Sequence, residues 1–283
     1  MIKMEYAIEV HQLIKRYEDF TLGPIDLKVP KGYLIGYIGE NGSGKSTTLK
    51  AILGLIQPDS GKITVFGNQV KDNPQLLNKI GVVFDNLFLP GEMKLKEVGK
   101  YCSLSFTTWQ SKQFEEYLHQ FKLSPNKKVK DLSRGMKMKL SLSIALSHQA
   151  ELLILDEATS GLDPVVRDEI LDILLEFLQN ESHTVLISSH ILSDLEKTAD
   201  YIAFLHKGKL LFMEQKDQLI EEYGLCSVSN EAMKTIDPEA IVGKRSHAFG
   251  QELLVKRSLV PESMELSKPS IEDIMIFIIK GEV

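Results

Sequence analysis

The chain has 283 residues, of which 43% are hydrophobic and 25% are charged, and its net charge at pH 7 is −6. This composition is ordinary for a soluble globular protein, and the length allows one large domain and a smaller one. The acidic balance argues against a dedicated nucleic-acid-binding protein, which usually carries a basic surface. Cys102 and Cys226 lie far apart without metal-ligand spacing, so we expect reduced thiols.

The N-terminal part, residues 7–70, contains short β-rich runs separated by turns with Gly and Pro. The apolar run at 33–38 predicts a buried strand, and residues 48–53 predict a helix. Between them, residues 39–47 read GENGSGKST and fit the pattern G-x-x-x-x-G-K-[ST]. A strand, a glycine loop and a helix in this order form a P-loop.

The P-loop predicts binding of a nucleoside triphosphate. Its glycines let backbone N–H groups turn towards phosphate oxygens, and the helix N-terminus adds partial positive charge. Lys45 is expected to reach the β- and γ-phosphates, and the Ser46 hydroxyl is expected to bind Mg²⁺. The expected nucleotide-binding residues of the loop are Gly39, Asn41, Gly42, Gly44, Lys45, Ser46 and Thr47.

The character of the chain changes over residues 87–150. Mixed apolar and polar residues at 95–106, 109–121 and 136–147 suit amphipathic helices. We therefore expect a helical insertion within an α/β core.

The core pattern resumes after this insertion. Residues 152–155 predict a buried parallel strand, and residues 170–178 predict a helix whose first turn can accept Pro164. Residues 184–188 predict another strand, and residues 201–212 predict a hairpin. Strands that alternate with helices indicate an α/β fold.

The C-terminal part, residues 224–283, is expected to form a small accessory domain with a strand at 252–255 and a helix at 271–280. The longest clean apolar run, residues 274–279, is far shorter than the roughly 20 residues that span a bilayer. The N-terminus lacks the apolar region of a signal peptide. Any membrane role is therefore expected to be peripheral, through another chain.

Two acidic residues follow the apolar strand at 152–155, and this is the Walker B pattern. Asp156 is expected to hold Mg²⁺, directly or through water. Glu157 is expected at the carboxyl edge of the sheet, where it could polarise the attacking water as general base. Alone, such a pattern is weak, because strands often end in solvated charge, but downstream of a P-loop it becomes strong.

Together, these and four further motifs resemble the nucleotide-binding subunits of ABC transporters. Residues 132–136, LSRGM, resemble the signature motif, usually LSGGQ, and residues 160–163 resemble the D-loop. His190 resembles the switch histidine, and Tyr17 resembles the aromatic residue that stacks on adenine. The resemblance covers about residues 7–224.

The resemblance implies an α/β fold, a P-loop NTPase cassette of the ABC type, over residues 1–223. This cassette would combine an N-terminal antiparallel β subdomain with an inserted helical subdomain at about 87–150. A small α+β accessory domain would follow at 224–283.

The resemblance also implies roles across a dimer. Ser133 and Gly135, at the start of a predicted helix, would contact ATP held by the opposite subunit, so that two chains sandwich two nucleotides head to tail. His190 would donate a hydrogen bond to the γ-phosphate, and Tyr17 would stack on adenine. Outside this motif set, His190 would be interpreted as a structural histidine and Tyr17 as a tyrosine at a strand end.

Of the positions that depart from the family pattern, which include Met136 and Ala158, two bear on the site. Asp85 stands where the family normally has the Q-loop glutamine, and we expect it to join Ser46 and Asp156 around Mg²⁺ while Asn86 supplies the lost amide. The alternative is that the loop leaves both Asp85 and Asn86 solvated. Arg134 replaces the first signature glycine, and we expect it to face phosphate or the dimer partner rather than join a solvated basic face.

The signature region and residues 269–274 resemble bacterial exporter ATPases of the drug, lantibiotic and peptide-toxin type, including exporters of phenol-soluble modulins. This resemblance implies an ATPase with ATP and Mg²⁺ as cofactors, acting as a homodimer or with a second ATPase subunit. It also implies separate transmembrane permease subunits, no nucleic acid partner, and a peripheral location on the cytoplasmic face of the bacterial membrane.

The alternative is a soluble ABC ATPase that acts on ribosomes or DNA. Ribosome-type members usually carry two cassettes in one chain, whereas only one is visible here. DNA-repair types insert long coiled coils, whereas the insertion here is short and lacks sustained heptads. A P-loop kinase or GTPase does not explain the signature motif.

Overall fold

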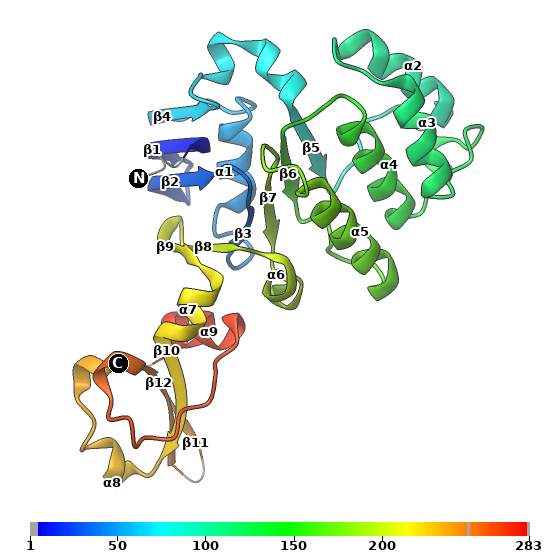
Figure 1. Ribbon diagram of the computed structural model, residues 1–283. Helices are drawn as coiled ribbons and strands as arrows, with labels where there is room; N and C mark the ends of the chain where they lie inside the picture. The colour runs from blue at the N-terminus through cyan, green and yellow to red at the C-terminus, as the bar shows by residue number, and fades with distance from the viewer. Residues whose placement is uncertain (1–4, 248–249, 282–283) are drawn as a thin grey trace.

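The computed structural model describes residues 5–247 and 250–281. A central sheet lies between an N-terminal antiparallel sheet and a group of helices, and a small C-terminal domain lies at one end of the molecule (Figure 1). This mixed architecture agrees with the expected α/β fold and its antiparallel β subdomain.

The central sheet of the described chain has six strands: β3 Leu34–Ile38, β5 Ile80–Phe84, β6 Leu152–Asp156, β7 Thr184–Ser189, β8 Tyr201–His206 and β9 Lys209–Gln215. Their order is β5-β6-β7-β3-β8-β9, and only β9 runs antiparallel to its neighbour, as the predicted hairpin requires. Every residue of β3, β6 and β7 is buried, because these apolar runs are covered on both faces.

The register of the parallel strands brings their carboxyl ends to one edge of this sheet. Ile38 pairs with Ser189, and Asp156 pairs with Ser188 on one side and with Phe84 on the other. The loops that follow β3, β7, β6 and β5 therefore begin side by side, at the edge where α/β sheets bind ligands.

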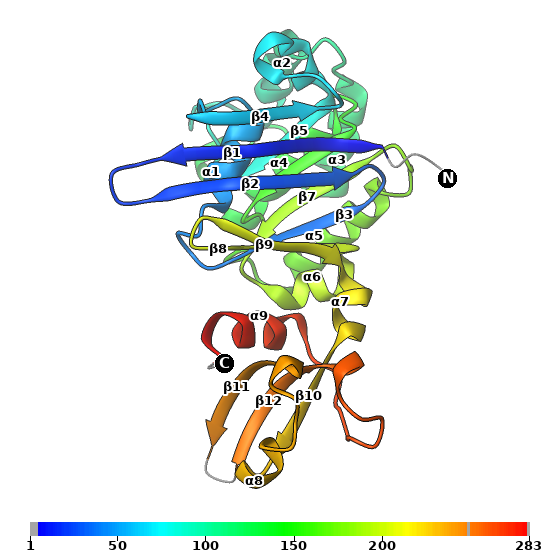
Figure 2. The same cartoon turned by 90° about the vertical axis from the view of Figure 1, so that its left-hand side faces the viewer.

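The N-terminal sheet contains β1 Tyr6–Arg16, β2 Thr21–Pro30 and β4 Ser60–Val65. They pair antiparallel in the order β2-β1-β4, and Figure 2 shows this sheet from its outer side. Buried and exposed residues alternate along much of β2, so one face packs on the core while the other meets solvent. β2 also lies against β9, which connects this sheet to the central one.

The helical region contains α2 Leu95–Ser105, α3 Ser111–Gln120 and α4 Arg134–Leu146, close to the three predicted helices. α4 begins earlier than its predicted start at 136, because the Ser133 hydroxyl accepts a hydrogen bond from the Met136 N–H and caps the helix. Figure 1 shows these helices beyond the β5 edge of the central sheet, away from the N-terminal sheet.

Several helices begin earlier than predicted or were missed. α1 Lys45–Ile52 starts inside the glycine loop, and α5 Pro164–Phe177 starts at its proline because Asp163 caps it through the Val166 N–H. The missed α-helices are α6 Leu192–Thr198, α7 Lys216–Glu222 and α8 Asn230–Met233. Short 3₁₀ helices are Val70–Asp72, Pro74–Lys79, Val129–Asp131, Pro238–Ala240 and Arg257–Leu259.

The C-terminal domain is a three-stranded antiparallel sheet with a helix. Its strands are β10 Tyr223–Val228, β11 Ile241–His247 and β12 Gly250–Lys256, in the order β10-β12-β11, and its helix is α9 Ile271–Lys280. The predicted strand at 252–255 lies within β12, whereas β10 and β11 were missed because their sequences, YGLCSV and IVGKRSH, mix apolar residues with glycine and polar residues. The predicted domain boundary falls at the start of β10.

Helix α9 joins this domain to the cassette. Ile271, Ile274 and Phe277 on α9 are at most 1% exposed, and they belong to the same apolar core as Leu195 on α6. The Ile271 N–H at the start of α9 also donates to the Glu196 carboxylate on α6, at 2.5 Å. Across the described ranges, no helix combines the length and apolarity needed to cross a membrane.

We predict that Phe277→Ala lowers the free energy of unfolding by about 3–5 kcal/mol, because a buried phenylalanine is replaced by a cavity. Chemical denaturation of the full chain measures this change. The control is Leu259→Ala, at a leucine that is 45% exposed, which should change stability by less than about 0.5 kcal/mol. A Phe277→Ala variant as stable as the parent would show that α9 does not contribute to the core.

Candidate functional site

The glycine loop after β3 has a backbone that favours glycine. Gly42 and Gly44 have φ angles of +80° and +110°, which L side chains rarely adopt. A Cβ added at Gly44 would also lie 2.7 Å from the Leu22 side chain and 3.1 Å from the Phe20 ring. The glycines therefore allow the loop to pass close to β2 and its preceding turn.

The loop ends at the N-terminus of α1. The first helical hydrogen bond is Thr48 N–H to Gly44 C=O, so the N–H groups of Lys45, Ser46 and Thr47 precede the helical ladder. The buried Ser43 hydroxyl has no hydrogen-bond partner among the described residues. Unpaired donors at a helix N-terminus suit phosphate oxygens, so this observation fits the predicted triphosphate site.

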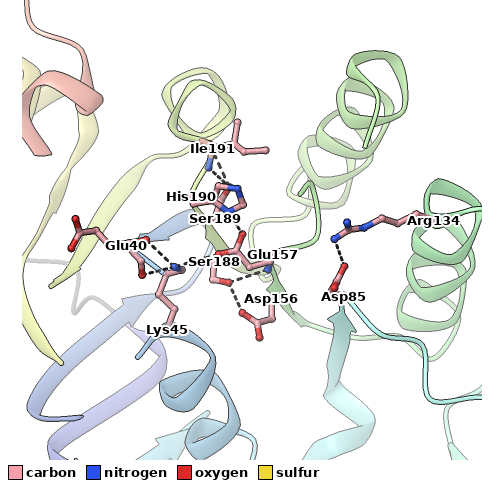
Figure 3. Close-up of polar contacts among 11 residues, drawn as sticks. Glu40, Lys45, Asp85, Arg134, Asp156, Glu157, Ser188, Ser189, His190 and Ile191 are labelled. Carbon is pink, nitrogen blue, oxygen red and sulfur yellow. Dashed lines mark hydrogen bonds and ion pairs between the residues drawn. The ribbon is translucent and has the colours of Figure 1, made fainter. Parts of the chain in front are cut away.

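The side chain of Lys45 turns back into the loop and is only 5% exposed. Its ammonium group donates to the Gly39 carbonyl at 2.8 Å and to the Glu40 carbonyl at 3.2 Å. The same nitrogen lies 3.3 Å from a carboxylate oxygen of Glu157. Lys45 therefore connects the glycine loop with the acid that follows β6 (Figure 3).

Glu157 stands between two functional side chains. One carboxylate oxygen faces Lys45, and the other lies 2.5 Å from Nδ1 of His190. Its φ angle is +53°, an unfavourable value for a residue with a Cβ. Its N–H is held by the hydroxyl and the carbonyl of Ser188, both at 3.1 Å. These contacts hold the backbone in a conformation that places the carboxylate over the strand ends.

Asp156 is nearly buried at the end of β6. The Ser188 hydroxyl donates to its carboxylate at 2.6 Å. The described residues contain no cluster of three or more His, Cys, Asp or Glu side chains suited to a metal. Mg²⁺ often uses one or two protein ligands and completes its shell with water and substrate phosphates, so Asp156 with half-buried Ser46 fits such a shared site.

Two contributions were missed from the sequence. Ser188 fixes both acids of the Walker B motif, although it stands in a strand whose residues are all buried. The buried Tyr37 hydroxyl donates to the Thr48 hydroxyl at 3.0 Å and so fixes α1 against β3; burial raises the pKa of Tyr37. A polar residue within a buried strand beside a motif was the available signal in both cases.

The predicted adenine-stacking residue lies near the loop. The Tyr17 N–H donates to the Phe20 carbonyl at 2.8 Å, and the Tyr17 side chain is 47% exposed. A hollow of about 520 Å³ beside the glycine loop is lined by Phe20, Asn41 and Gly42, among others, and Tyr17 is outside this lining. The structure thus places Tyr17 on the turn that reaches the loop, with Phe20 nearer to the glycines.

The signature residues lie apart from the glycine loop of the same chain. Ser133 caps α4, and Gly135 packs so tightly that an added Cβ would lie 3.2 Å from Val166. Figure 3 shows Arg134 at the start of α4, well away from Lys45 and Glu157. One chain therefore does not bring its own signature motif to its own phosphate loop.

Asp85 is not placed as predicted. We expected it to join Ser46 and Asp156 around Mg²⁺, but its carboxylate forms an ion pair with Arg134 and points away from Asp156 (Figure 3). The reason is electrostatic, because the replacement of a signature glycine by arginine supplies a cation within reach. We therefore leave Asp85 out of the candidate metal site.

Comparison with known proteins identifies several relatives. A family model described as ABC transporter matches residues 22–160. The chain is 37% identical to the bacitracin transport ATP-binding protein BcrA of Enterococcus faecalis, over 75% of this chain and 70% of that protein. It is 30% identical to the protein of the same name from Bacillus licheniformis, over 98% of this chain and 99% of that protein.

Another relative and a solved structure are also ATP-binding proteins of transporters. The lantibiotic transport ATP-binding protein SrtF of Streptococcus pyogenes is 34% identical over 74% of this chain and 91% of its own length. A solved structure described as the ATP-binding subunit of an ABC transporter has a TM-score of 0.69 and 27% identity, covering 75% of this chain and 91% of that one. These proteins have transport names, so they give no support to the alternative of a ribosome- or DNA-directed ATPase.

We predict that Ser188→Ala lowers the free energy of unfolding by about 1–3 kcal/mol, because the buried Asp156 carboxylate loses its donor. Urea denaturation measures the change. Ser103→Ala is the control. The exposed Ser103 hydroxyl donates to the Lys100 carbonyl of its own helix in the described structure, so its loss should change stability by less than about 0.5 kcal/mol. Equal stabilities of the two variants would contradict the structural role given to Ser188.

Proposed function

The chain belongs to the ABC transporter family as an ATP-binding subunit, and from this premise we propose that it hydrolyses ATP with Mg²⁺ to power export of a peptide, toxin or drug. The observation that carries the proposal is the position of Glu157, between Lys45 and His190 at the carboxyl edge of the sheet. A carboxylate held beside a phosphate-binding lysine is suited to act on the water that attacks a γ-phosphate.

In the proposed site, the α1 N-terminus and the glycine loop bind the phosphates. Lys45 now contacts two carbonyls and Glu157, and we propose that it exchanges these for the β- and γ-phosphates. A triphosphate carries more negative charge than one carboxylate, so the exchange is electrostatically favourable. Ser46 and Asp156 would hold Mg²⁺, which neutralises charge on the phosphates. Tyr17 would stack on adenine, on the side where Phe20 and the hollow lie.

Loss of the lysine contact would free Glu157 to accept a proton from the attacking water. His190 already lies beside the Glu157 carboxylate, and it would orient that carboxylate and donate a hydrogen bond to the γ-phosphate. The backbone of Glu157 is fixed by Ser188, so its carboxylate is positioned before nucleotide binds.

The distance between the signature motif and the loop of one chain supports a composite site. We propose that Ser133 and Gly135 contact ATP held by a second subunit, either another copy of this chain or a related ATPase. The capped N-terminus of α4 directs unpaired N–H groups outwards, which suits phosphate. ATP binding would then close the dimer, and hydrolysis would let it reopen.

The proposed partners are separate membrane subunits that form the translocation path, with this chain bound at the cytoplasmic face of the membrane. Relatives named for bacitracin and lantibiotic transport support a substrate of the peptide-antibiotic or toxin type. The net charge of −6 supports the absence of a nucleic acid partner.

We predict that Glu157→Gln retains ATP binding and loses turnover by about 10²–10⁴-fold, the usual contribution of general base catalysis. Phosphate release and binding of a fluorescent ATP analogue measure the two properties. Glu151→Gln is the matched control, because Glu151 precedes β6 at the opposite end of the strand and pairs with Lys79. Normal turnover in Glu157→Gln would refute the assignment of the base.

We also predict that the chain associates with membranes only when it is produced together with its membrane subunits. In the described ranges, no helix of the chain is long and apolar enough to cross a bilayer. Flotation on a density gradient, with and without the membrane subunits, measures this dependence. Recovery of the chain with ribosomes or DNA in both preparations would contradict the transport proposal.

A further inference from the structure

The ion pair between Asp85 and Arg134 connects two parts of the cassette. Asp85 directly follows β5 of the central sheet, and Arg134 is the first residue of α4 in the helical region. Their positions along the chain differ by 49 residues, so the contact depends on the tertiary fold. It is drawn at the right of Figure 3, apart from the contacts around Lys45.

The same guanidinium also covers the D-loop. Gly161 has a φ angle of +65°, and a Cβ added there would lie 3.0 Å from the guanidinium carbon of Arg134. Arg134 thus touches the segment after β5, the start of the signature helix and the glycine of the D-loop. In the proposed dimer, the signature helix faces the second subunit.

Two of the departures from the family pattern are complementary. An aspartate replaces a neutral glutamine, and an arginine replaces a glycine, and one contact between them accounts for both. Because the side chains of Arg134 and Asp85 are 47% and 45% exposed, solvent screens the pair and it stabilises the resting subunit only weakly. A triphosphate competes well for the arginine, since guanidinium binds phosphate through two parallel, charge-assisted hydrogen bonds.

We propose that Asp85 is a positioning residue that holds Arg134 within its own subunit until ATP on a second copy of this chain draws the arginine away. Arg134 then contacts the triphosphate across the dimer, and Asp85 is released to solvent. The pair thus opposes dimer closure at low ATP concentration and adds a cation to the composite site once closure occurs. This inference rests on the proposed ATP-dependent dimer.

The test measures dimerisation of the full chain by light scattering during an ATP titration with Mg²⁺, with Glu157→Gln present in every protein to prevent turnover. Asp85→Asn should lower the ATP concentration for half-maximal dimerisation by about 1.5- to 5-fold, the range that an exposed ion pair allows. Arg134→Gly should raise it by about tenfold or more, because a charge-assisted contact is lost.

The double variant of Asp85→Asn with Arg134→Gly shows whether Asp85 acts by holding Arg134 or whether the two residues affect dimerisation independently. It should match Arg134→Gly alone, since Asp85 acts only through the arginine. The matched control is Glu92→Gln, which removes the carboxylate paired with Lys128 and Lys130 at 2.7 and 2.6 Å. It should leave the half-maximal ATP concentration unchanged. Thermal melts confirm that each monomer is folded.

Three outcomes overturn the inference alone. The first is an unchanged or higher half-maximal ATP concentration for Asp85→Asn. The second is an Asp85→Asn substitution that still lowers this concentration when Arg134 is replaced by glycine. The third is weaker Mg²⁺-dependent ATP binding by the Asp85→Asn monomer, because Asp85 would then act on the metal. A parent that binds ATP but stays monomeric also overturns the inference and leaves the ATPase proposal to its own turnover test. A folded parent that binds no ATP overturns both.

Discussion

The site depends on the parallel register of β5, β6, β7 and β3. These strands end level with one another, so the four loops that follow them begin at one edge of the sheet. Each of these loops contributes a different side chain or backbone segment to this edge. The glycine loop, His190, the Walker B acids and Asp85 come from segments far apart in sequence. A slip of one residue in this pairing would turn the terminal side chains to the other face of the sheet.

Within this arrangement, charge balance sets the resting state of the site. Lys45 is almost fully buried, and a buried ammonium needs partners because desolvation is costly. The loop carbonyls and Glu157 satisfy it. Ser188 fixes the backbone of Glu157 and the carboxylate of Asp156 at once. The acids are therefore positioned by the sheet itself, and in the proposed function a nucleotide would replace Glu157 as the anionic partner of Lys45.

The C-terminal domain is joined to the same edge through α6. This helix begins two positions after His190, and its Leu195 shares a core with Ile274 and Phe277 of α9. Packed interiors transmit displacement because they contain few voids. The accessory domain therefore packs directly on α6, the helix that follows His190. The helical region also packs apolar residues of α4 against β5, with Ala145 and Val83 in one core. At the carboxyl edge it adds the weaker, more exchangeable contact between Arg134 and Asp85.

The glycine loop, the Walker B acids and most helices and strands of the cassette could be predicted from the sequence, because short patterns of glycine, apolar residues and acids specify these features locally. The resemblance to the family also implied that Ser133 contacts ATP held by the opposite subunit, and this stays a prediction. Only the tertiary structure decided that Asp85 faces Arg134 instead of Asp156, that Ser188 supports both acids, and that α9 packs on α6. These contacts join residues distant in sequence, so strand order and packing set them, and local periodicity carries no information about either.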